Sequence, residues 1–284
     1  MKRILKKFIK SDSLLYLLIV DLKHRYQKLR GLRHDIQYTR TDPDYHLIRL
    51  GSKHCGWTYV DDPSLHQGII LSAGLGEDGS FETEFAARHE ATVHIIDPTP
   101  RAVHHFGCIC ERLGRSREVT YSETGTQPIE SYDLSNVAPD QLRLHEVALW
   151  NERKRVKFFL PKDASHVSHS IVNFQNGYVS DTPWIEVDAI PAQELLEQIG
   201  ITSGQVVLMK LDIEGAEIEV IEHLLATNFL PRQLLVEFDE FNIPTKRGLA
   251  RIDHAHNLLT AHGYNVIHTD GQANFLYIRN QSNA

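Results

Sequence analysis

The sequence has few cysteines and no apolar run long enough to cross a membrane. Cys55, Cys108 and Cys110 are odd in number and lack the spacing of zinc ligands, so they indicate no disulfide framework and favour a reducing compartment. The longest apolar run near the N-terminus, Leu14 to Val20, has only seven residues, and no small-residue cleavage site follows it. We therefore expect a cytoplasmic protein without a secretory signal.

Positive charge is scarce outside the first 40 residues. Residues 1–40 carry 11 Lys or Arg against 3 Asp, a net of +8, whereas the whole chain has a net charge of −7. An acidic main body disfavours binding to nucleic acid. Residues 1–33 alternate basic with apolar residues and contain no Pro or Gly before Gly31, which predicts a basic helix. Such a helix either docks on its own domain, the commoner arrangement, or makes peripheral contact with an anionic membrane.

The chain divides into an N-terminal part, residues 1–67, and a main domain, residues 68–284. The first part combines the basic helix with a polar approach segment. In the second, apolar strands alternate with helical patterns, which predicts an α/β fold with a doubly wound, mainly parallel, Rossmann-like sheet. Tyr264 to His268 and Asn274 to Ile278 flank a turn and predict a C-terminal antiparallel hairpin. Nothing in the sequence specifies an oligomeric state.

A glycine loop opens the main domain. An apolar strand leads into Gly74, Gly76 and Gly79, which match G-x-G-x-x-G, and a helical pattern follows. The next strand ends at Asp97, 18 residues past Gly79, where an acid in such a unit accepts hydrogen bonds from ribose hydroxyls. The residues predicted to contact a cofactor are Ala73, Gly74, Leu75, Gly76, Asp78, Gly79, Asp97, Pro98, Ala148 and Asp212.

Two further strands are expected between the glycine loop and residue 150. Residues 114–140 form a polar connection with one short strand near Val119. Leu144 to Trp150 is predicted to form a single long strand. Its end, at Ala148, Leu149 and Trp150, is either an apolar slot for a purine or ordinary core.

The stretch from Gln205 to Glu217, Q-V-V-L-M-K-L-D-I-E-G-A-E, ends a buried strand on two acids. Asp212 and Glu214 lie at its carboxyl end, where ligands bind in open α/β sheets, although acids there also cap helices. Glu237 ends a later strand in the same way. His166 and His169 belong to a loop that we expect near the mouth of the site. The catalytic candidates are Asp212, Glu214, Glu237 and His169, and no residue spacing demands a metal.

Two kinds of cofactor suit a glycine loop followed by an acid. A pyrophosphate beside Glu77 and Asp78 would be repelled by about 1 to 4 kcal/mol for each close pair of charges. The amino-acid end of S-adenosylmethionine is cationic, so the same carboxylates would attract it. We therefore predict a methyl donor. An NAD-dependent enzyme is the alternative, and a non-catalytic Rossmann-like module that binds a partner through its basic N-terminus is a third.

The run Lys210 to Glu217, K-x-D-x-E-G-x-E, resembles the signature of FkbM-type S-adenosylmethionine-dependent methyltransferases. The glycine loop, Asp97-Pro98 and Glu237 fall in the expected order, and the resemblance spans residues 68–280. It implies a seven-stranded class I methyltransferase sheet and O-methylation of a hydroxyl on a sugar, glycan or other secondary metabolite. The family's first loop commonly reads D-x-G-A-N-x-G; residues 72–79 lack its early acid and its Asn, and Asp97 stands where Glu is common.

Overall fold

The computed structural model describes Leu22, Arg25, Tyr26, Leu29 and residues 45–161, 169–173, 176, 179–242 and 244–280. The predicted basic helix over residues 1–33 therefore lies almost entirely outside the described residues, and so does His166. In the part of the chain that is described, no helix is long and apolar enough to span a bilayer.

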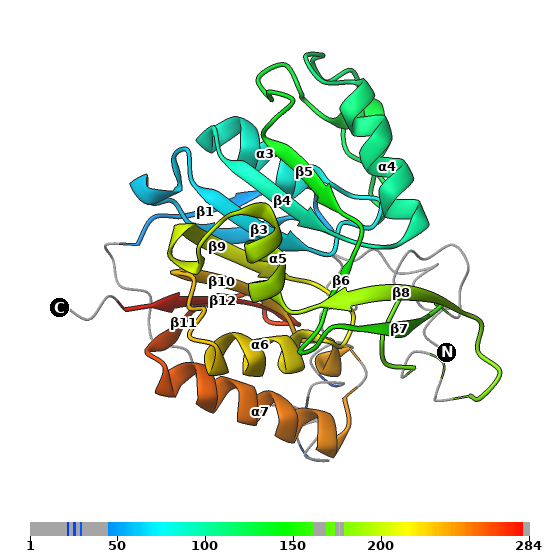
Figure 1. Cartoon of the computed structure of the whole chain (residues 1–284), viewed down its shortest axis with the longest axis vertical. Coiled ribbons are helices and arrows are strands. Elements are labelled where there is room, and N and C mark those ends of the chain that lie inside the picture. The colour runs from blue at the N-terminus through cyan, green and yellow to red at the C-terminus, as the bar shows by residue number, and fades with distance from the viewer. Residues whose placement is uncertain are drawn as a thin grey trace.

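A seven-stranded sheet forms the centre of the structure (Figure 1). Its order is β11-β12-β10-β9-β3-β4-β5, and only β12 runs against its neighbours. The predicted mainly parallel sheet with a C-terminal antiparallel hairpin is thereby confirmed. The strands are β3 (Ile69–Ala73), β4 (Thr92–Ile96), β5 (Leu142–His145), β9 (Val206–Leu211), β10 (Gln233–Glu237), β11 (Tyr264–Thr269) and β12 (Asn274–Arg279).

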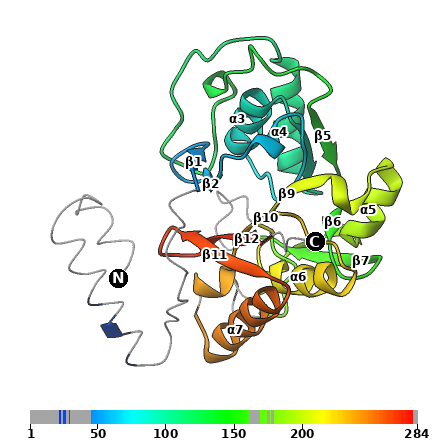
Figure 2. The same cartoon turned by 90° about the vertical axis from the view of Figure 1, so that its left-hand side faces the viewer.

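Helices cover both faces of this sheet. Figures 1 and 2 show α3 and α4 beside β3, β4 and β5, and α6 and α7 beside β10, β11 and β12. The helices are α3 (Ser80–His89), α4 (Pro100–Glu111), α5 (Ala192–Ile199), α6 (Glu217–Ala226) and α7 (Lys246–Ala261). Short 3-10 turns are η1 (Pro63–Leu65), η2 (Ile129–Ser131), η3 (Ser203–Gln205) and η4 (Asp239–Phe241).

Side chains alternate between two apolar cores along each buried strand. On β3, Ile70 packs in the core that contains α3, whereas Leu71 packs in the core that contains α6. On β9, Leu208 faces α3 and Met209 faces α6. Lys210 follows in register on the α3 side, where only 3% of it is exposed. The strand alternation thus buries a lysine beneath the glycine loop.

Two strand predictions were wrong. No strand forms near Val119, which is 45% exposed in an irregular segment with no neighbouring strand to pair with in the described structure. The expected strand from Leu144 to Trp150 is divided, because the chain leaves β5 and β6 (Ala148–Leu149) joins a second sheet. That sheet has the order β6-β8-β7, with β7 (Lys154–Phe159) and β8 (Trp184–Ile190) side by side (Figure 1).

A hairpin that the sequence did not indicate precedes the main sheet. β1 (Leu47–Leu50) pairs with β2 (Trp57–Val60), and the hydroxyl of the buried Tyr59 lies 2.6 Å from Nε2 of His89 on α3. On β10, the buried Gln233 accepts a hydrogen bond from the N–H of Val60 at 3.0 Å and donates one to its carbonyl at 2.8 Å. The approach segment from residue 45 onward therefore packs on the main domain, while the domain boundary at residue 67 stays a prediction.

Replacing Gln233 with leucine tests this attachment. We expect the free energy of unfolding to fall by about 2 to 6 kcal/mol, because two buried backbone groups of Val60 lose their partners at about 1 to 3 kcal/mol each. Urea denaturation monitored by circular dichroism measures it. Gln198→Leu, at an exposed position on α5, is the matched control and should change stability by less than about 0.5 kcal/mol. Equal effects of both variants would contradict the assignment.

Candidate active site

A cavity of about 270 Å³ lies beyond the carboxyl ends of β3, β4, β9 and β10. All four catalytic candidates line it, and so do all the predicted cofactor contacts except Ala73 and Gly79. Ala73 is fully buried in β3, and the N–H of Gly79 donates to the Tyr132 hydroxyl at 3.1 Å. The predicted residues that the structure brings together here are Gly74, Leu75, Gly76, Asp78, Asp97, Pro98, Ala148, His169, Asp212, Glu214 and Glu237.

The first glycine of the loop touches the end of β9. Gly74 has a φ of +87°, and a Cβ added to it would lie 1.8 Å from the carbonyl oxygen of Asp212. Only glycine fits there, because any side chain would collide with backbone. The N–H of Asp212 donates to the carbonyl of Ala73 at 3.1 Å. Asp212 therefore faces the glycine loop across the switch point of the sheet, as predicted.

Asp97 holds the glycine loop in place. Its Oδ2 accepts hydrogen bonds from the N–H groups of Leu75 at 2.9 Å and Gly76 at 3.0 Å. Its Oδ1 accepts from the N–H and the hydroxyl of Thr99 at 2.9 and 2.7 Å, so Thr99 does not cap α4 with its side chain. A carboxylate has about four acceptor positions, and these hydrogen bonds fill them. A ribose contact at Asp97 needs a sugar hydroxyl to replace one of them, and it stays a prediction.

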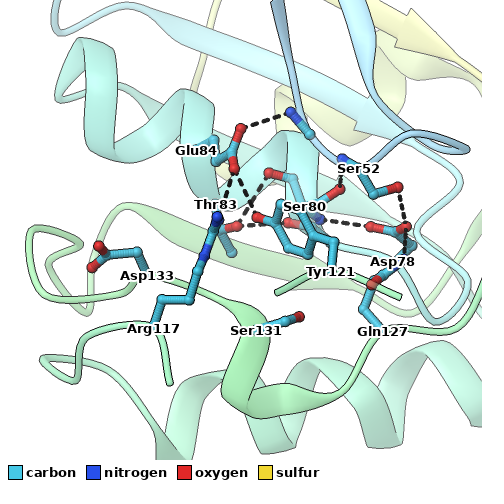
Figure 3. Close-up of polar contacts among 12 residues, drawn as sticks. Ser52, Asp78, Ser80, Thr83, Glu84, Arg117, Tyr121, Gln127, Ser131 and Asp133 are labelled. Carbon is cyan, nitrogen blue, oxygen red and sulfur yellow. Dashed lines mark hydrogen bonds and ion pairs between the residues drawn. The ribbon is translucent and has the colours of Figure 1, made fainter. Parts of the chain in front are cut away.

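The two acids of the loop are anchors, which corrects the expectation that both present free charge to a cofactor. Arg101 donates from Nε to Oε1 of Glu77 at 2.9 Å and from an Nη to Oε2 at 2.6 Å. These hydrogen bonds hold the pKa of Glu77 below its usual range. Asp78 is 3% exposed and accepts from the Ser52 hydroxyl at 2.6 Å and from Gln127 at 2.9 Å (Figure 3). The charge of the glycine loop therefore favours S-adenosylmethionine over NAD less strongly than the sequence predicts.

Two segments distant in sequence clamp the start of α3. The N–H of Gly51 donates to Glu84 at 2.7 Å, and the same carboxylate accepts from Arg117 at 3.0 Å and from the Tyr121 hydroxyl at 2.8 Å (Figure 3). The N–H of Ser52 donates to the Ser80 hydroxyl at 2.7 Å. These hydrogen bonds pack the turn between β1 and β2 against the end of the glycine loop and the start of α3.

This turn adds residues to the site that sequence reasoning missed. His54, Cys55 and Trp57 all line the cavity. Residues 52–57 match no motif, and only the glycines at 51 and 56 hint at a tight turn. Gly56 is required there, because a Cβ would lie 2.5 Å from the carbonyl oxygens of residues 50 and 52.

Lys210 on β9 contacts both the glycine loop and α3. Its Nζ donates to the carbonyl of Gly74 at 2.5 Å and to Oε1 of Glu82 at 3.2 Å, and it lies 3.8 Å from Oδ2 of Asp212. It also lies 5.9 Å from the ring centroid of Trp57, within cation–π range. Burial alone would lower the pKa of Lys210, but the carboxylates of Glu82 and Asp212 outweigh it and raise the pKa. The ammonium is therefore charged at neutral pH.

Asp212 and Glu237 form a carboxyl pair at the mouth of the cavity. Burial is the main cause that raises the pKa of both groups, and that of Glu237 reaches about 9. The two side chains lie within hydrogen-bonding range, with Asp212 as the acceptor. Lys210 favours the charged form of Asp212. At neutral pH Glu237 is therefore protonated, and Lys210 stabilises the carboxylate form of Asp212.

The remaining predicted acid shapes the loop after β9. Glu214 has a φ of +56°, and its carbonyl accepts a hydrogen bond from the hydroxyl of Ser170. Glu217, the first residue of α6, accepts the N–H groups of Ile213 at 2.8 Å and Gly215 at 2.9 Å, so it holds the loop that leads into the helix. Ser170 holds its neighbour His169 at the cavity, which agrees with the expected loop at the mouth.

The apolar side of the cavity comes from the second sheet. Ala148, Leu149 and Phe158 line it, whereas Trp150, the third residue of the predicted slot, does not. The break between β5 and β6 brings Ala148 and Leu149 to this position. Among the described residues, no group of three or more His, Cys, Asp or Glu side chains is arranged to hold a metal ion.

The sequence profile of the methyltransferase FkbM domain matches residues 71–266. The chain belongs to the FkbM methyltransferase family. The match includes the glycine loop, Asp97, Asp212 and Glu237, so the predicted resemblance is confirmed and the nicotinamide alternative loses its support. No curated protein is significantly similar in sequence to the chain.

Three solved structures are distantly similar to this FkbM methyltransferase. Monomeric WbdD has 12% sequence identity and a TM-score of 0.38, and the match covers 75% of this chain and 36% of WbdD, so this chain spans about a third of that protein. The fibrillarin pre-rRNA processing protein of Methanococcus jannaschii has 10% identity and a TM-score of 0.38, with 87% and 88% covered. TYW2 of M. jannaschii in complex with AdoMet has 10% identity and a TM-score of 0.31, with 87% and 90% covered.

The departure of this chain from the FkbM pattern has a structural counterpart. The common D-x-G places an acid two residues before the first glycine, where this chain has Ser72. The Ser72 hydroxyl donates to Oε1 of Glu82 on α3 at 2.5 Å, and the same oxygen accepts from Lys210. Oε2 of Glu82 is buried without a partner among the described residues. The carboxylate of Glu82 on α3 therefore lies beside Ser72, the position where the family pattern has an acid.

The contribution of Glu237 to the stability of the protein should fall as pH rises from about 5 to 9. Folding raises the pKa of Glu237 from 4.5 to about 9, so in that window the folded chain binds more protons than the unfolded chain. The stabilisation is complete below about pH 4.5 and is lost as pH approaches 9. Urea denaturation across this range measures the effect. Glu237→Gln should make the decline less steep, while Glu197→Gln, at an exposed position on α5, should leave it unchanged.

Proposed function

We propose that this protein is an S-adenosylmethionine-dependent O-methyltransferase whose acceptor is a hydroxyl of a sugar, glycan or other secondary metabolite. The observation that carries the proposal is the carboxyl pair Asp212 and Glu237 at the mouth of a glycine-loop cavity in an FkbM domain. Transfer to an alcohol needs a group that takes its proton, since a protonated alcohol is a poor nucleophile. The pair supplies such a group at the place where a cofactor and an acceptor would meet.

The residues in the cavity fit the methyl donor. Ala148, Leu149 and Phe158 offer an apolar surface suited to adenine, and the backbone of the glycine loop allows close approach. Asp78 keeps a carboxylate at the loop, bonded only to neutral donors in the contacts described above, and it suits an ammonium group. Asp97 positions the loop and is the proposed partner of the ribose.

The carboxylate of Asp212, the form that Lys210 stabilises, is the proton acceptor in this proposal. When bound, S-adenosylmethionine supplies a methyl group activated by its sulfonium. Asp212 would take the proton of the acceptor hydroxyl as that oxygen received the methyl group. Glu237 keeps Asp212 in place by donating a hydrogen bond, and Lys210 fixes the carboxylate from the other side. Alignment and exclusion of water are the other tasks of the site.

Calorimetric titration of the full chain with S-adenosylmethionine, S-adenosylhomocysteine and NAD tests the cofactor. We expect the two adenosyl-sulfur compounds to bind and NAD not to bind. Asp97→Ala should weaken binding at least about tenfold, because the loop loses two charge-assisted hydrogen bonds at about 1.5 to 3 kcal/mol each. Asp140→Ala, at an exposed position, is the matched control. Binding of NAD alone would reject the proposal, and binding of none would favour a non-catalytic module.

A pair of isosteric variants tests the roles of the two carboxyl groups. Asp212→Asn should lower kcat by about 10² to 10⁴, the usual contribution of a general base. Glu237→Gln keeps a hydrogen-bond donor towards Asp212, so its loss should stay below about tenfold. Release of S-adenosylhomocysteine with a panel of hydroxylated sugars and glycosides measures both. The reverse order of effects would make Glu237 the base.

A further inference from the structure

A second cavity opens beside the site. It has a volume of about 340 Å³ and shares His54, Trp57, Glu237 and Asn274 with the first cavity. The side chain of Glu237, which belongs to the proposed proton-accepting pair, therefore lies where the two cavities meet. A molecule in the second cavity would contact Glu237, whose side chain is hydrogen-bonded to Asp212 of the first cavity. On the proposed function, this is where the acceptor binds.

The wall of the second cavity away from Glu237 is cationic. Arg49 and Lys53 both line it and both come from the β1–β2 hairpin. Within the described part of the chain, the guanidinium of Arg49 bonds only to carbonyl oxygens of the turn, at 3.4 Å to Gly51, 2.7 Å to Ser52 and 3.0 Å to Lys53. Carbonyl groups orient the guanidinium and leave its charge uncompensated. No ion pair to Arg49 forms among the described residues.

Lys53 adds to this positive charge, and the acids of the lining offset it only in part. The ammonium of Lys53 lies 3.9 Å from Glu123, and both side chains are mostly exposed, so this pair is weak. The described lining contains two carboxyl groups, Glu237 and Asp270. Glu237 is protonated at neutral pH, because burial raises its pKa to about 9. Asp270 is exposed and accepts two backbone N–H groups of its own turn. Two cations thus face one carboxylate.

We propose that the second cavity is the acceptor subsite and that Arg49 and Lys53 bind an anionic group, a phosphate or a carboxylate, carried by a hydroxylated acceptor. Arg49 and Lys53 then hold the anion while the hydroxyl to be methylated points at Asp212. His268 and Gln272 also line the cavity and offer hydrogen bonds to a polyhydroxylated molecule. The inference rests on the proposed methyl transfer, and it narrows the acceptor from any alcohol to an acidic one.

Anion binding to the full chain tests the inference without turnover. The probes are inorganic phosphate, D-glucuronate and the neutral isostere D-glucuronamide, titrated by NMR with and without S-adenosylhomocysteine. We expect phosphate or glucuronate to bind at least tenfold more tightly than glucuronamide. The double variant Arg49→Gln/Lys53→Gln should lower the affinity for the anion at least tenfold. Its affinity for S-adenosylhomocysteine should stay unchanged. Phosphate alone or glucuronate alone as the ligand would tell which anion the subsite takes.

Matched variants keep the outcome unambiguous. Arg115→Gln/Arg143→Gln removes the same charge from exposed positions next to α4 and in β5, away from the cavity, and should leave anion binding intact. Lys53→Glu alone avoids any disturbance of the Arg49 contacts and should weaken anion binding further than Lys53→Gln. Failure of both anions to bind the wild-type chain, or equal binding by the double variant at the cavity, would overturn the inference. Loss of S-adenosylhomocysteine binding alone would instead count against the proposed function.

Discussion

The site depends on one buried charge, the ammonium of Lys210. Removing an ammonium from water costs several kcal/mol, so Lys210 is stable there only because Glu82 and Asp212 surround it. Its hydrogen bond to the carbonyl of Gly74 ties the glycine loop to β9. Its contact with the ring of Trp57 ties the first hairpin to the same point. Three segments that are distant in sequence therefore meet around one atom, namely the β1–β2 hairpin, the glycine loop with α3, and β9, and Lys210 itself lines the cavity.

The buried lysine also explains how this chain tolerates a changed first loop. Ser72 stands where the family pattern has an acid, and a serine alone would leave Lys210 without one of its counter-charges. Glu82 supplies a carboxylate from α3 and binds both residues through a single oxygen. In this chain the carboxylate beneath the loop therefore comes from a helix. Through these bonds Glu82 and Lys210 hold the glycine loop at the end of β9.

The fold was largely predictable because its signals are local. Apolar runs, glycines and helical periods located the strands and helices of the main sheet, and the family pattern implied their order. The predictions failed where pairing partners decide the structure. The run from residue 144 to 150 looks like one strand, yet it changes sheets within two residues. The hairpin of residues 47–60 has no strong pattern of its own and forms because Tyr59 and Gln233 secure it to the main domain.

The candidate site was predictable in place but only partly in chemistry. Position at strand ends correctly located Asp97, Asp212 and Glu237 in one cavity, since parallel strands end at one edge. Charge alone misjudged Glu77, because sequence gives no sign that Arg101 lies opposite it. The same limit hid the cationic wall built by Arg49 and Lys53, which lie in a segment without motifs. Strand ends thus fix where chemistry occurs, and long-range packing decides which carboxylates are anchors and which remain for catalysis.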